Sequence, residues 1–331
     1  MKNCVGVDIG ENSVKLAVMN GARIVRLICE PLPDNLVRDG KILSPETLAD
    51  VLRGAMHKNR ASARDCALVL PQDAAFTRRV TIPYMTLDQL KINLPYEFHD
   101  YIQNDKDRYF YDYAVIGTGT DTDGKPATLD LLAAAAAKDT INESREMLKK
   151  AGLRLKTAIP VSFAFRNIIS GYEAEHSDSH PSEYCIVDMG HHAIRMHIFR
   201  GSVWDTTRTL DLGGASMDAL IADHLSVDQH VAAGYKLSDY GNVCDLGSCK
   251  ELYSRIAVEI MRAVNFYSFN NPDSSLRDIY FCGGLAEIKP LMAEIRDTVE
   301  KNIHSIGELL PSITKAEHGE LFAAAAGAAM Q

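Results

Sequence analysis

Residues 5–18 read VGVDIGENSVKLAV and residues 185–199 read CIVDMGHHAIRMHIF, so the chain contains one short pattern twice. Each copy is an apolar run, an Asp, one apolar residue, a Gly, a short turn and a second apolar run. Apolar runs broken by a tight turn predict a β-hairpin. Two such hairpins facing each other would hold the phosphates of one nucleotide between two halves of a molecule.

The residues at the two turns suit a polyphosphate and its metal ion. Gly10 and Gly190 allow a tight turn whose backbone N–H groups face phosphate oxygens. Asp8 and Asp188 stand just before these turns, where a carboxylate can hold Mg²⁺, usually through its waters. Lys15 adds a positive charge to the first hairpin. A single Asp-x-Gly turn is common in proteins that bind no ligand, so it is the pair that indicates nucleotide binding.

Two Gly-Gly turns follow later in the chain, each expected between a strand and a helix. They are Gly213 with Gly214 and Gly283 with Gly284. Such a turn exposes the N–H groups of the helix and lets a flat base lie against the backbone. Neither turn has the spacing of a P-loop or of the Gly-x-Gly-x-x-Gly fingerprint, which disfavours ordinary Walker and Rossmann sites.

The composition is that of an ordinary globular protein. The 331 residues are enough for two domains, and 46% are apolar and 24% charged. The net charge of −9 argues against nucleic acid or an anionic membrane surface as the main partner. Seven scattered cysteines and a start without signal-peptide character predict reduced thiols in the cytoplasm. The sequence contains no run of about 18 apolar residues that would predict a membrane span. Residues 321–330 are expected to form a packed helix.

Some elements are harder to predict from the sequence. Propensity favours a helix for the alanine-rich residues 128–138. Their position between a polar loop and the evident helix at 140–151 makes a buried strand at least as plausible. Further helices are expected over residues 161–170 and 289–302.

Taken in order, the four sites resemble those of the actin-like ATPase superfamily. The closer resemblance is to the PilM family of type IV pilus assembly proteins, which are relatives of the cell-division protein FtsA. FtsA itself fits less well, because it carries a C-terminal membrane-targeting helix that is not seen in this sequence. The similar segments run along the chain: residues 5–16, 79–85, 94–97, 111–115, 151–153, 208–214 and 234–236.

The resemblance implies an α/β fold with two actin-like (ribonuclease H-like) lobes around a nucleotide cleft and an inserted α+β subdomain. The expected division is 1–76 with 157–180 for the first lobe (1A), 77–156 for the insert (1C), 181–225 with 275–331 for the second lobe (2A), and 226–274 for a helical subdomain (2B).

It also implies roles for the site residues, with ATP or ADP as the nucleotide and Mg²⁺ as the metal. Asp8 and Asp188 would position the metal. The nucleotide-binding residues would be Gly10, Asn12, Ser13 and Lys15 at the first phosphate turn, Gly190, His191 and His192 at the second, Gly213 and Gly214 near the ribose and α-phosphate, Gly283, Gly284 and Leu285 against adenine, and Lys236 at the adenosine.

The sequence departs from the family pattern at three places. Ala233 stands where the family usually has an acidic residue, three positions before the lysine of the adenosine site. Ile159 and Val161 occupy the segment between the lobes, where an acidic pair usually places a water. His191 and His192 replace small hydroxyl-bearing residues. Because a missing water-positioning group costs roughly 10²–10⁴-fold in rate, we expect nucleotide binding with weak or absent hydrolysis.

The function implied by the resemblance is that of a cytoplasmic scaffold in a type IV pilus or type II secretion-like assembly machine. Such a scaffold lies at the inner face of the cell membrane through its partners, without inserting into the membrane, and can form a homo-oligomeric ring. The family grips the N-terminal cytoplasmic peptide of the membrane protein PilN in a groove between the first lobe and the insert. We expect that groove to involve the apolar and aromatic residues around Tyr84 to Phe98, including Leu87, Leu90 and Leu94, unless these residues form the core of the insert.

Three alternatives stay open at this point. A pseudo-ATPase scaffold that binds no nucleotide is favoured by Ala233, His191 and His192. An FtsA-like cell-division protein shares much of the pattern. A small-molecule kinase of the same superfold would need a catalytic Asp near the cleft, and Ile159 and Val161 argue against one.

Overall fold

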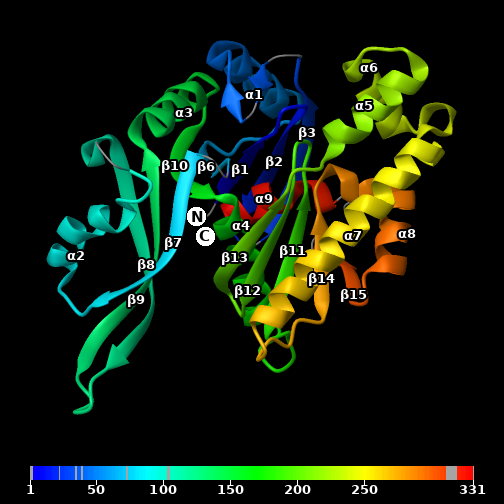
Figure 1. Cartoon of the computed structure of the whole chain (residues 1–331). Coiled ribbons are helices and arrows are strands. Elements are labelled where there is room, and N and C mark those ends of the chain that lie inside the picture. Colours follow the sequence, from blue (N-terminus) through cyan, green and yellow to red (C-terminus); the bar gives the residue numbers. More distant parts are fainter. Residues whose placement is uncertain are drawn as a thin grey trace.

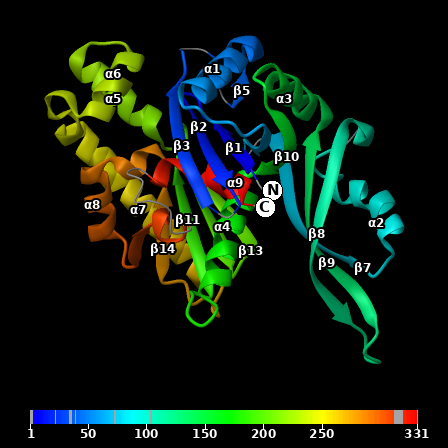
Figure 2. The same cartoon turned by 180° about the vertical axis from the view of Figure 1, so that it is seen from behind.

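The computed structural model is a mixed α/β molecule built on two five-stranded sheets (Figures 1 and 2). The strand orders are β3-β2-β1-β6-β10 and β13-β12-β11-β14-β15. In each sheet three antiparallel strands are followed by two parallel ones, so the repeated hairpin belongs to a repeated lobe. The structure describes residues 3–21, 23–33, 36–38, 40–71, 74–102, 105–310 and 319–330.

The first sheet carries the first predicted hairpin as β1 and β2. Residues 4–7 of β1 are all buried, as expected for a strand covered on both faces. Helices α1 and α3 pack together and form one core with the sheet. The bounds are β1 (Asn3–Ile9), β2 (Ser13–Asn20), β3 (Arg23–Pro31), β4 (Val37–Arg38), β5 (Lys41–Ile42), α1 (Pro45–Lys58), β6 (Asp65–Leu70), α3 (Lys138–Lys150) and β10 (Arg154–Pro160).

The second sheet carries the second hairpin as β11 and β12. Helices α7 and α8 cover its outer face, and α5 and α6 stand at its upper end (Figure 1). The bounds are β11 (Glu183–Met189), β12 (Ile194–Arg200), β13 (Val203–Leu210), α5 (Gly214–Leu225), α6 (Gln229–Ser238), α7 (Gly247–Asn270), β14 (Asp278–Cys282), α8 (Lys289–Thr298) and β15 (Asn302–Ser305), with 3-10 helices η4 (Tyr240–Asp245), η5 (Gly284–Glu287) and η6 (Ile306–Glu308).

The helix predicted for residues 289–302 is wrong at its end. The helix stops at Thr298, and Val299 already has extended backbone. Asn302 begins β15, where Ile303 pairs with Ile279 of β14. The pairing completes the parallel part of the sheet, so sheet formation overrides the helical continuation.

Two helices lie between the sheets, α4 (Val161–Glu175) and α9 (Ala323–Ala329), the latter preceded by the 3-10 helix η7 (Gly319–Phe322) (Figures 1 and 2). They share one buried core with strands of both lobes. The predicted packed C-terminal helix is therefore confirmed, and it joins the two halves. Helix α4 extends beyond its expected end at residue 170.

The insert has its own sheet, in the order β7-β9-β8, and its own hydrophobic core. The alanine-rich run is the central strand β9, so the strand alternative is confirmed and the helix suggested by propensity is wrong. In Figures 1 and 2 this sheet stands between α2 and the two larger sheets. The bounds are β7 (Ala75–Pro83), α2 (Leu87–Asn93), η2 (Leu94–Phe98), η3 (Lys106–Arg108), β8 (Tyr109–Thr120) and β9 (Pro126–Ala137).

Contacts of α3 and β10 bear on where the insert ends. Met147 and Leu148 of α3 lie in the core of the first lobe, and Arg154 of β10 pairs with Asp65 of β6. These contacts favour an end of the insert near Ala137 rather than at residue 156. The division into subdomains 1A, 1C, 2A and 2B otherwise stays a prediction. None of the helices in the described part of the chain has the length and hydropathy of a membrane span.

Candidate functional site

A cleft of about 550 Å³ lies between the two lobes, where the turns of both hairpins face each other. It brings together all of the predicted site residues except Gly213. Those that line it are Asp8, Gly10, Asn12, Ser13, Lys15, Asp188, Gly190, His191, His192, Gly214, Lys236, Gly283, Gly284 and Leu285.

The two hairpin turns share one backbone geometry. The N–H of Gly10 donates to the carbonyl oxygen of Ser13 at 3.1 Å, and the N–H of Gly190 donates to that of Ala193 at 3.2 Å. A Cβ atom at Gly190 would lie 2.7 Å from the oxygen of Ala193, so this tight turn needs glycine. The repeat in the sequence is therefore a repeat of structure down to single hydrogen bonds.

Each hairpin also places a cation opposite its Asp. Strand pairing sets Asp8 opposite Lys15 and Asp188 opposite Arg195. Arg195 lines the cleft, but the sequence reading did not include it among the site residues. It stands at the same offset from Asp188 as Lys15 does from Asp8, so the repeat itself carried the signal.

The two carboxylates influence each other across the cleft. Burial, and then the charge of Asp8, raise the pKa of Asp188 to about 6, although Arg195 and Lys15 act in the opposite direction. Two carboxylates that repel each other, with cations beside them, form a donor set that a hard divalent cation would neutralise. The residues therefore fit a Mg²⁺ ion carried with a polyphosphate.

The first Gly-Gly turn packs against the second hairpin. The N–H of Gly214 donates to the oxygen of Gly190 at 3.1 Å, and that of Ala215 donates to the oxygen of His191 at 2.8 Å. A Cβ atom at Gly213 would lie 2.3 Å from the oxygen of His191. Gly213 therefore supports the phosphate turn from behind instead of lining the cleft, and its predicted place near the ribose and α-phosphate stays a prediction.

The second Gly-Gly turn requires glycine at its first position. Gly283 has a φ of +89°, and a Cβ atom there would lie 2.6 Å from the carbonyl oxygen of Met189. Its N–H donates to the carbonyl oxygen of Glu320 at 3.1 Å. Gly284 and Leu285, which line the cleft, begin a 3-10 helix in place of the expected α-helix.

Lys236 is buried and paired with an acid that the sequence reading missed. Its Nζ lies 2.7 Å from Oδ1 of Asp218 and donates to the carbonyl oxygen of Gly214 at 3.3 Å. Asp218 follows Gly214 by one helical turn on α5, which places both on one face of that helix. Asp218 on α5 is thus the acidic partner of Lys236, whereas the family pattern usually has an acidic residue at the position of Ala233.

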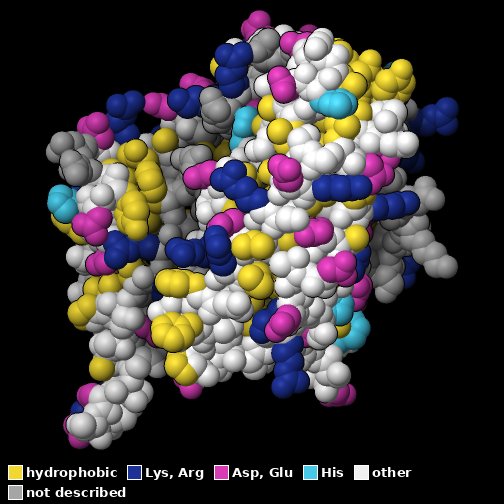
Figure 3. Space-filling view, turned by 45° about the vertical axis from the view of Figure 1, so that its right-hand side comes forward, with side chains coloured by type: hydrophobic (Ala, Val, Ile, Leu, Met, Phe, Trp, Pro, Cys, Tyr) yellow, Lys and Arg dark blue, Asp and Glu magenta, His cyan; other side chains and the backbone are white. Residues whose placement is uncertain are grey.

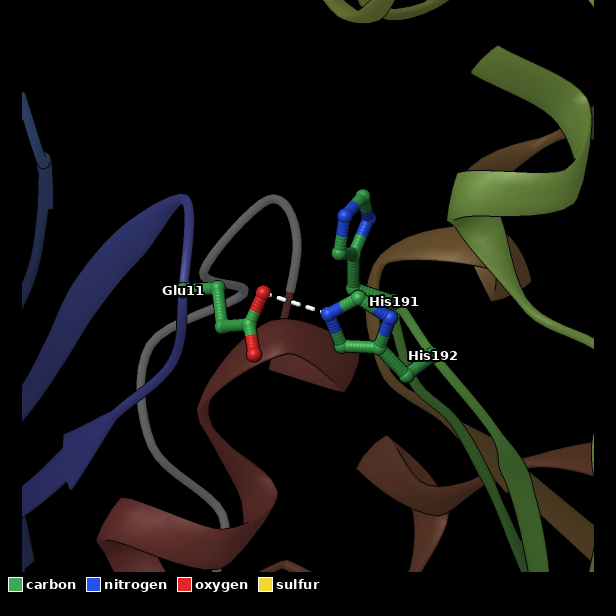
Figure 4. Close-up of side chains that lie close together, drawn as sticks. All are labelled: Glu11, His191 and His192. Atoms are coloured by element: carbon green, nitrogen blue, oxygen red, sulfur yellow. Dashed lines mark hydrogen bonds and ion pairs between the residues drawn. The ribbon is translucent and has the colours of Figure 1, made fainter. Parts of the chain in front are cut away.

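The second phosphate turn reaches across to the first. Figure 4 shows Glu11 on the first turn and His191 and His192 on the second, with His192 directed at the carboxylate of Glu11, its hydrogen-bond and ion-pair partner. Nδ2 of Asn12 lies 3.4 Å from Nδ1 of His191. Burial, and then the neighbouring His192, lower the pKa of His191. The imidazoles therefore connect the lobes instead of standing free.

The segment between the lobes presents an apolar side chain to the cleft. Val161 lines it at the start of α4, while Ile159 lies in β10 and is not part of the lining. Neither can position a water for attack on a phosphate. Weak or absent hydrolysis accordingly stays our prediction.

The predicted peptide-groove residues do not behave alike. Leu90 and Leu94 are buried in the core of the insert, so their assignment to a groove is wrong. Leu87 is 62% exposed at the start of α2. Leu87, Leu90 and Leu94 follow one another at spacings of three and four residues. In the sequence, this spacing cannot distinguish side chains that line a groove from side chains that form a core.

Charges of both signs are intermingled on the face that Figure 3 displays, without an extended basic surface over its coloured atoms. Hydrophobic side chains occur there in small groups. The expectation that nucleic acid is not a partner remains a prediction that agrees with this surface.

Comparison with known proteins places the chain in a family. Residues 6–311 match the family model of the type IV pilus assembly protein PilM. No curated protein matches the sequence. Among solved structures, the PilM-PilN type IV pilus biogenesis complex is similar with a TM-score of 0.81 at 22% identity, covering 99% of this chain and 97% of that chain.

A second solved structure, the ethanolamine utilization protein EutJ from Carboxydothermus hydrogenoformans, has a TM-score of 0.61 at 15% identity, covering 98% of this chain and 88% of that one. These likenesses confirm the predicted actin-like fold. The match to the family model covers most of the sequence, so it shows the family as well as the fold. The chain belongs to the PilM family of type IV pilus assembly proteins.

Proposed function

We propose that this chain is a cytoplasmic scaffold of a type IV pilus or related secretion machine, which binds the N-terminal cytoplasmic peptide of a PilN-like membrane protein. The observation that carries the proposal is the family match over residues 6–311, supported by likeness along 99% of the chain to the PilM-PilN complex. The scaffold would lie at the inner face of the cell membrane through that partner.

Nucleotide in the cleft would bias the two lobes toward one arrangement. Asp8 and Asp188 would hold Mg²⁺, and Lys15 and Arg195 would face the phosphates. When bound, Mg²⁺ would spread the charge of the polyphosphate. Since these residues come from both lobes, ATP or ADP would favour the arrangement in which both reach it, and such a two-state element can be coupled to peptide binding.

The base of the insert offers a place for the peptide beside the first lobe. Ala75, Ala136 and Phe110 lie side by side in the insert's sheet and therefore share one face. Ala75 and Ala136 pack against the core of the first lobe, so this face is directed toward that lobe. Phe110 is nevertheless 43% exposed, with Nζ of Lys138 5.6 Å from its ring centroid. Leu87 lies on the α2 side of the same sheet, so this proposal places it outside the groove that the sequence predicts for it.

Binding of a labelled synthetic peptide, the N-terminal cytoplasmic segment of the PilN-like protein from the same genome, tests the proposal by fluorescence polarisation. Phe110→Glu should weaken binding at least about tenfold, because a charge would replace an aromatic contact. Leu87→Glu should bind like the wild type, as should Phe269→Glu, which changes a more exposed aromatic on α7.

Each failure would have a distinct meaning. Absence of binding to the wild type at about 100 μM peptide would contradict the proposed partner, because any remaining affinity would be weaker than about 5.5 kcal/mol. Undiminished binding by Phe110→Glu would contradict only the placement of the groove. Circular dichroism of each variant checks that the fold is kept.

A further inference from the structure

We propose that Glu11, His191 and His192 form a binding site for a transition-metal cation, Zn²⁺ in the first place, that ties the two hairpin turns together across the cleft. One ligand atom from each side chain can be chosen so that all three lie within 4.8 Å of one another. Within the described residues no other group of three His, Cys, Asp or Glu side chains meets this criterion. Figure 4 shows Glu11 on one turn and both histidines on the other, with His192 directed at Glu11 and the ring of His191 beside it.

The donor set selects the class of metal. Two imidazoles and one carboxylate are ligands of Zn²⁺ and similar ions, whereas Mg²⁺ prefers oxygen ligands alone. This site is therefore chemically distinct from the pair Asp8 and Asp188, which offers only oxygens. Tetrahedral Zn²⁺ with bonds of about 2.0–2.1 Å needs its donors about 3.3 Å apart. Side-chain rotation would have to bring the donors from within 4.8 Å of one another to that separation, and the fourth position remains for water or a ligand.

Neighbouring groups already orient the three donors. The N–H of Gly40 lies 3.4 Å from Oε1 of Glu11 and donates to it, while the other carboxylate oxygen pairs with His192. Nδ1 of His191 lies 3.7 Å from Oδ2 of Asp218, and a carboxylate beside an imidazole is the usual support of a metal-bound histidine. The two rings stand edge to face with centroids 4.6 Å apart.

The site spans the two halves of the molecule. Glu11 belongs to the first lobe and both histidines belong to the second. A bound Zn²⁺ would cross-link the lobes at the cleft and occupy the turn that is also proposed to face a phosphate. The inference itself depends neither on nucleotide binding nor on the peptide partner, because it rests only on these three side chains.

Isothermal titration of the full chain with ZnCl₂, without nucleotide or Mg²⁺, tests the site. All proteins should carry Cys29→Ser, because Cys29 is an exposed thiol that lines the same cleft and could bind Zn²⁺ by itself. We expect one Zn²⁺ per chain with micromolar or tighter affinity. Glu11→Gln and His192→Gln should each weaken binding at least about tenfold. The matched control His57→Gln, at an exposed position on α1, should leave it unchanged.

Titration with Co²⁺ gives an independent readout. A tetrahedral site with imidazole ligands should produce intense visible absorption in the parent and none in the two cleft variants. Absence of saturable Zn²⁺ binding by the parent would overturn the proposal, as would Zn²⁺ binding that survives in both Glu11→Gln and His192→Gln. Thermal melting without metal verifies that the variants fold. Mg-ATP binding is measured separately, so its failure would leave this result unaffected.

Discussion

The buried pair of Lys236 and Asp218 has a structural role besides its place in the cleft. Both side chains are almost fully buried, at 8% and 3% exposure, with 2.7 Å between their charged atoms. A buried charge that loses its partner is costly, whereas removing both charges together is often close to neutral. The pair therefore contributes to holding α5 and α6 against each other beside the second phosphate turn.

This pairing predicts the effect of removing one charge. Lys236→Met should lower the free energy of unfolding by about 3 kcal/mol, because it leaves the carboxylate of Asp218 buried without its cation. The double variant Lys236→Met with Asp218→Leu should recover most of the loss. Urea denaturation at pH 7.5 measures both. A loss below about 1 kcal/mol in the single variant would contradict the argument.

His197 should make the stability of the protein depend on pH. Burial on β12 lowers the pKa of His197 to about 3, from about 6.5 in an unfolded chain. Its Nδ1 lies 2.9 Å from Oγ1 of Thr207, its ring lies 5.2 Å from that of Phe165, and its Nε2 has no hydrogen-bond partner among the described residues. Because the unfolded state takes up the proton first, stability is retained above pH 6.5 and falls as the pH drops from 6.5 toward 3.

The measurement compares the wild type with His197→Asn, which does not titrate in this range. Between pH 7.5 and 5.5 the wild type should lose about 1 kcal/mol more unfolding free energy than the variant does. Urea denaturation of both proteins at the two pH values gives this difference directly, whatever the variant's loss at neutral pH. Equal pH dependence in the two proteins would show that His197 is not responsible.

Residues at turns could be predicted from the sequence, whereas contacts between distant elements could not. Gly10, Gly190 and Gly283 were found because tight turns and close approaches leave a mark in the residue type itself. Asp218 was missed because its partner Lys236 lies on another helix, and only folding brings the two together. Arg195 was missed although the repeat displayed it.

Helix α9 shows how small residues set the distance between elements. A Cβ atom on Gly6 of β1 would lie 1.7 Å from the carbonyl oxygen of Ala325, and one on Gly327 would lie 2.1 Å from that of Ala164 on α4. The backbone of α9 thus touches both a strand and a helix directly. Its alanines contribute to the core shared by the two sheets. The close packing of α9 therefore requires the small side chains of its residues.

Gly327→Ala should therefore destabilise the protein, although alanine favours helices. The added methyl group would force α9 and α4 apart, at a cost of about 1–3 kcal/mol or more. Gly54 on α1 is the matched control, since it is also helical and a Cβ atom there would meet nothing within 4 Å. Gly54→Ala should be neutral or stabilising by up to about 1 kcal/mol. Chemical denaturation of both variants measures the free energy of unfolding. Equal effects of the two substitutions would contradict the packing argument.

Elements whose pattern is local were predicted well, and those decided by their neighbours were not. Each of the hairpins β1–β2 and β11–β12 has two apolar runs separated by a short turn, a pattern that is visible within about 15 residues. The alanine run of β9 is helical by propensity, and its place between β7 and β8 makes it a strand. The end of α8 was misplaced because pairing with β14 is invisible in residues 299–302.

At the scale of the whole molecule, the cleft follows from the duplication. Two sheets of the same strand order place their hairpin turns at corresponding edges, and α4 and α9 fasten the sheets to each other. The turns face one another because each lobe presents the same edge. A ligand that contacts both turns therefore binds the folded molecule across its two halves and stabilises it as a unit.

Binding of Mg-ATP should consequently raise the melting temperature of the full chain. At a ligand concentration of about 100 times the dissociation constant, the stabilisation is about 2.7 kcal/mol, which corresponds to a shift of about 4 °C for a chain of this length. Asp8→Asn should reduce the shift to a small remainder, because it removes one of the two carboxylates that would hold the metal. It should melt at or above the wild-type temperature without ligand, because it relieves the repulsion that raises the pKa of Asp188.

Differential scanning fluorimetry in zinc-free buffer measures these shifts, with Asp223→Asn, at an exposed position on α5, as the matched control that should shift like the wild type. An equal shift in Asp8→Asn would contradict the assignment of the metal-binding carboxylates. The lack of any shift with millimolar Mg-ATP would contradict nucleotide binding itself and favour a pseudo-ATPase scaffold. In that case the contacts of the two imidazoles with Glu11 and Asn12 would be the reason, because these side chains occupy the space between the turns.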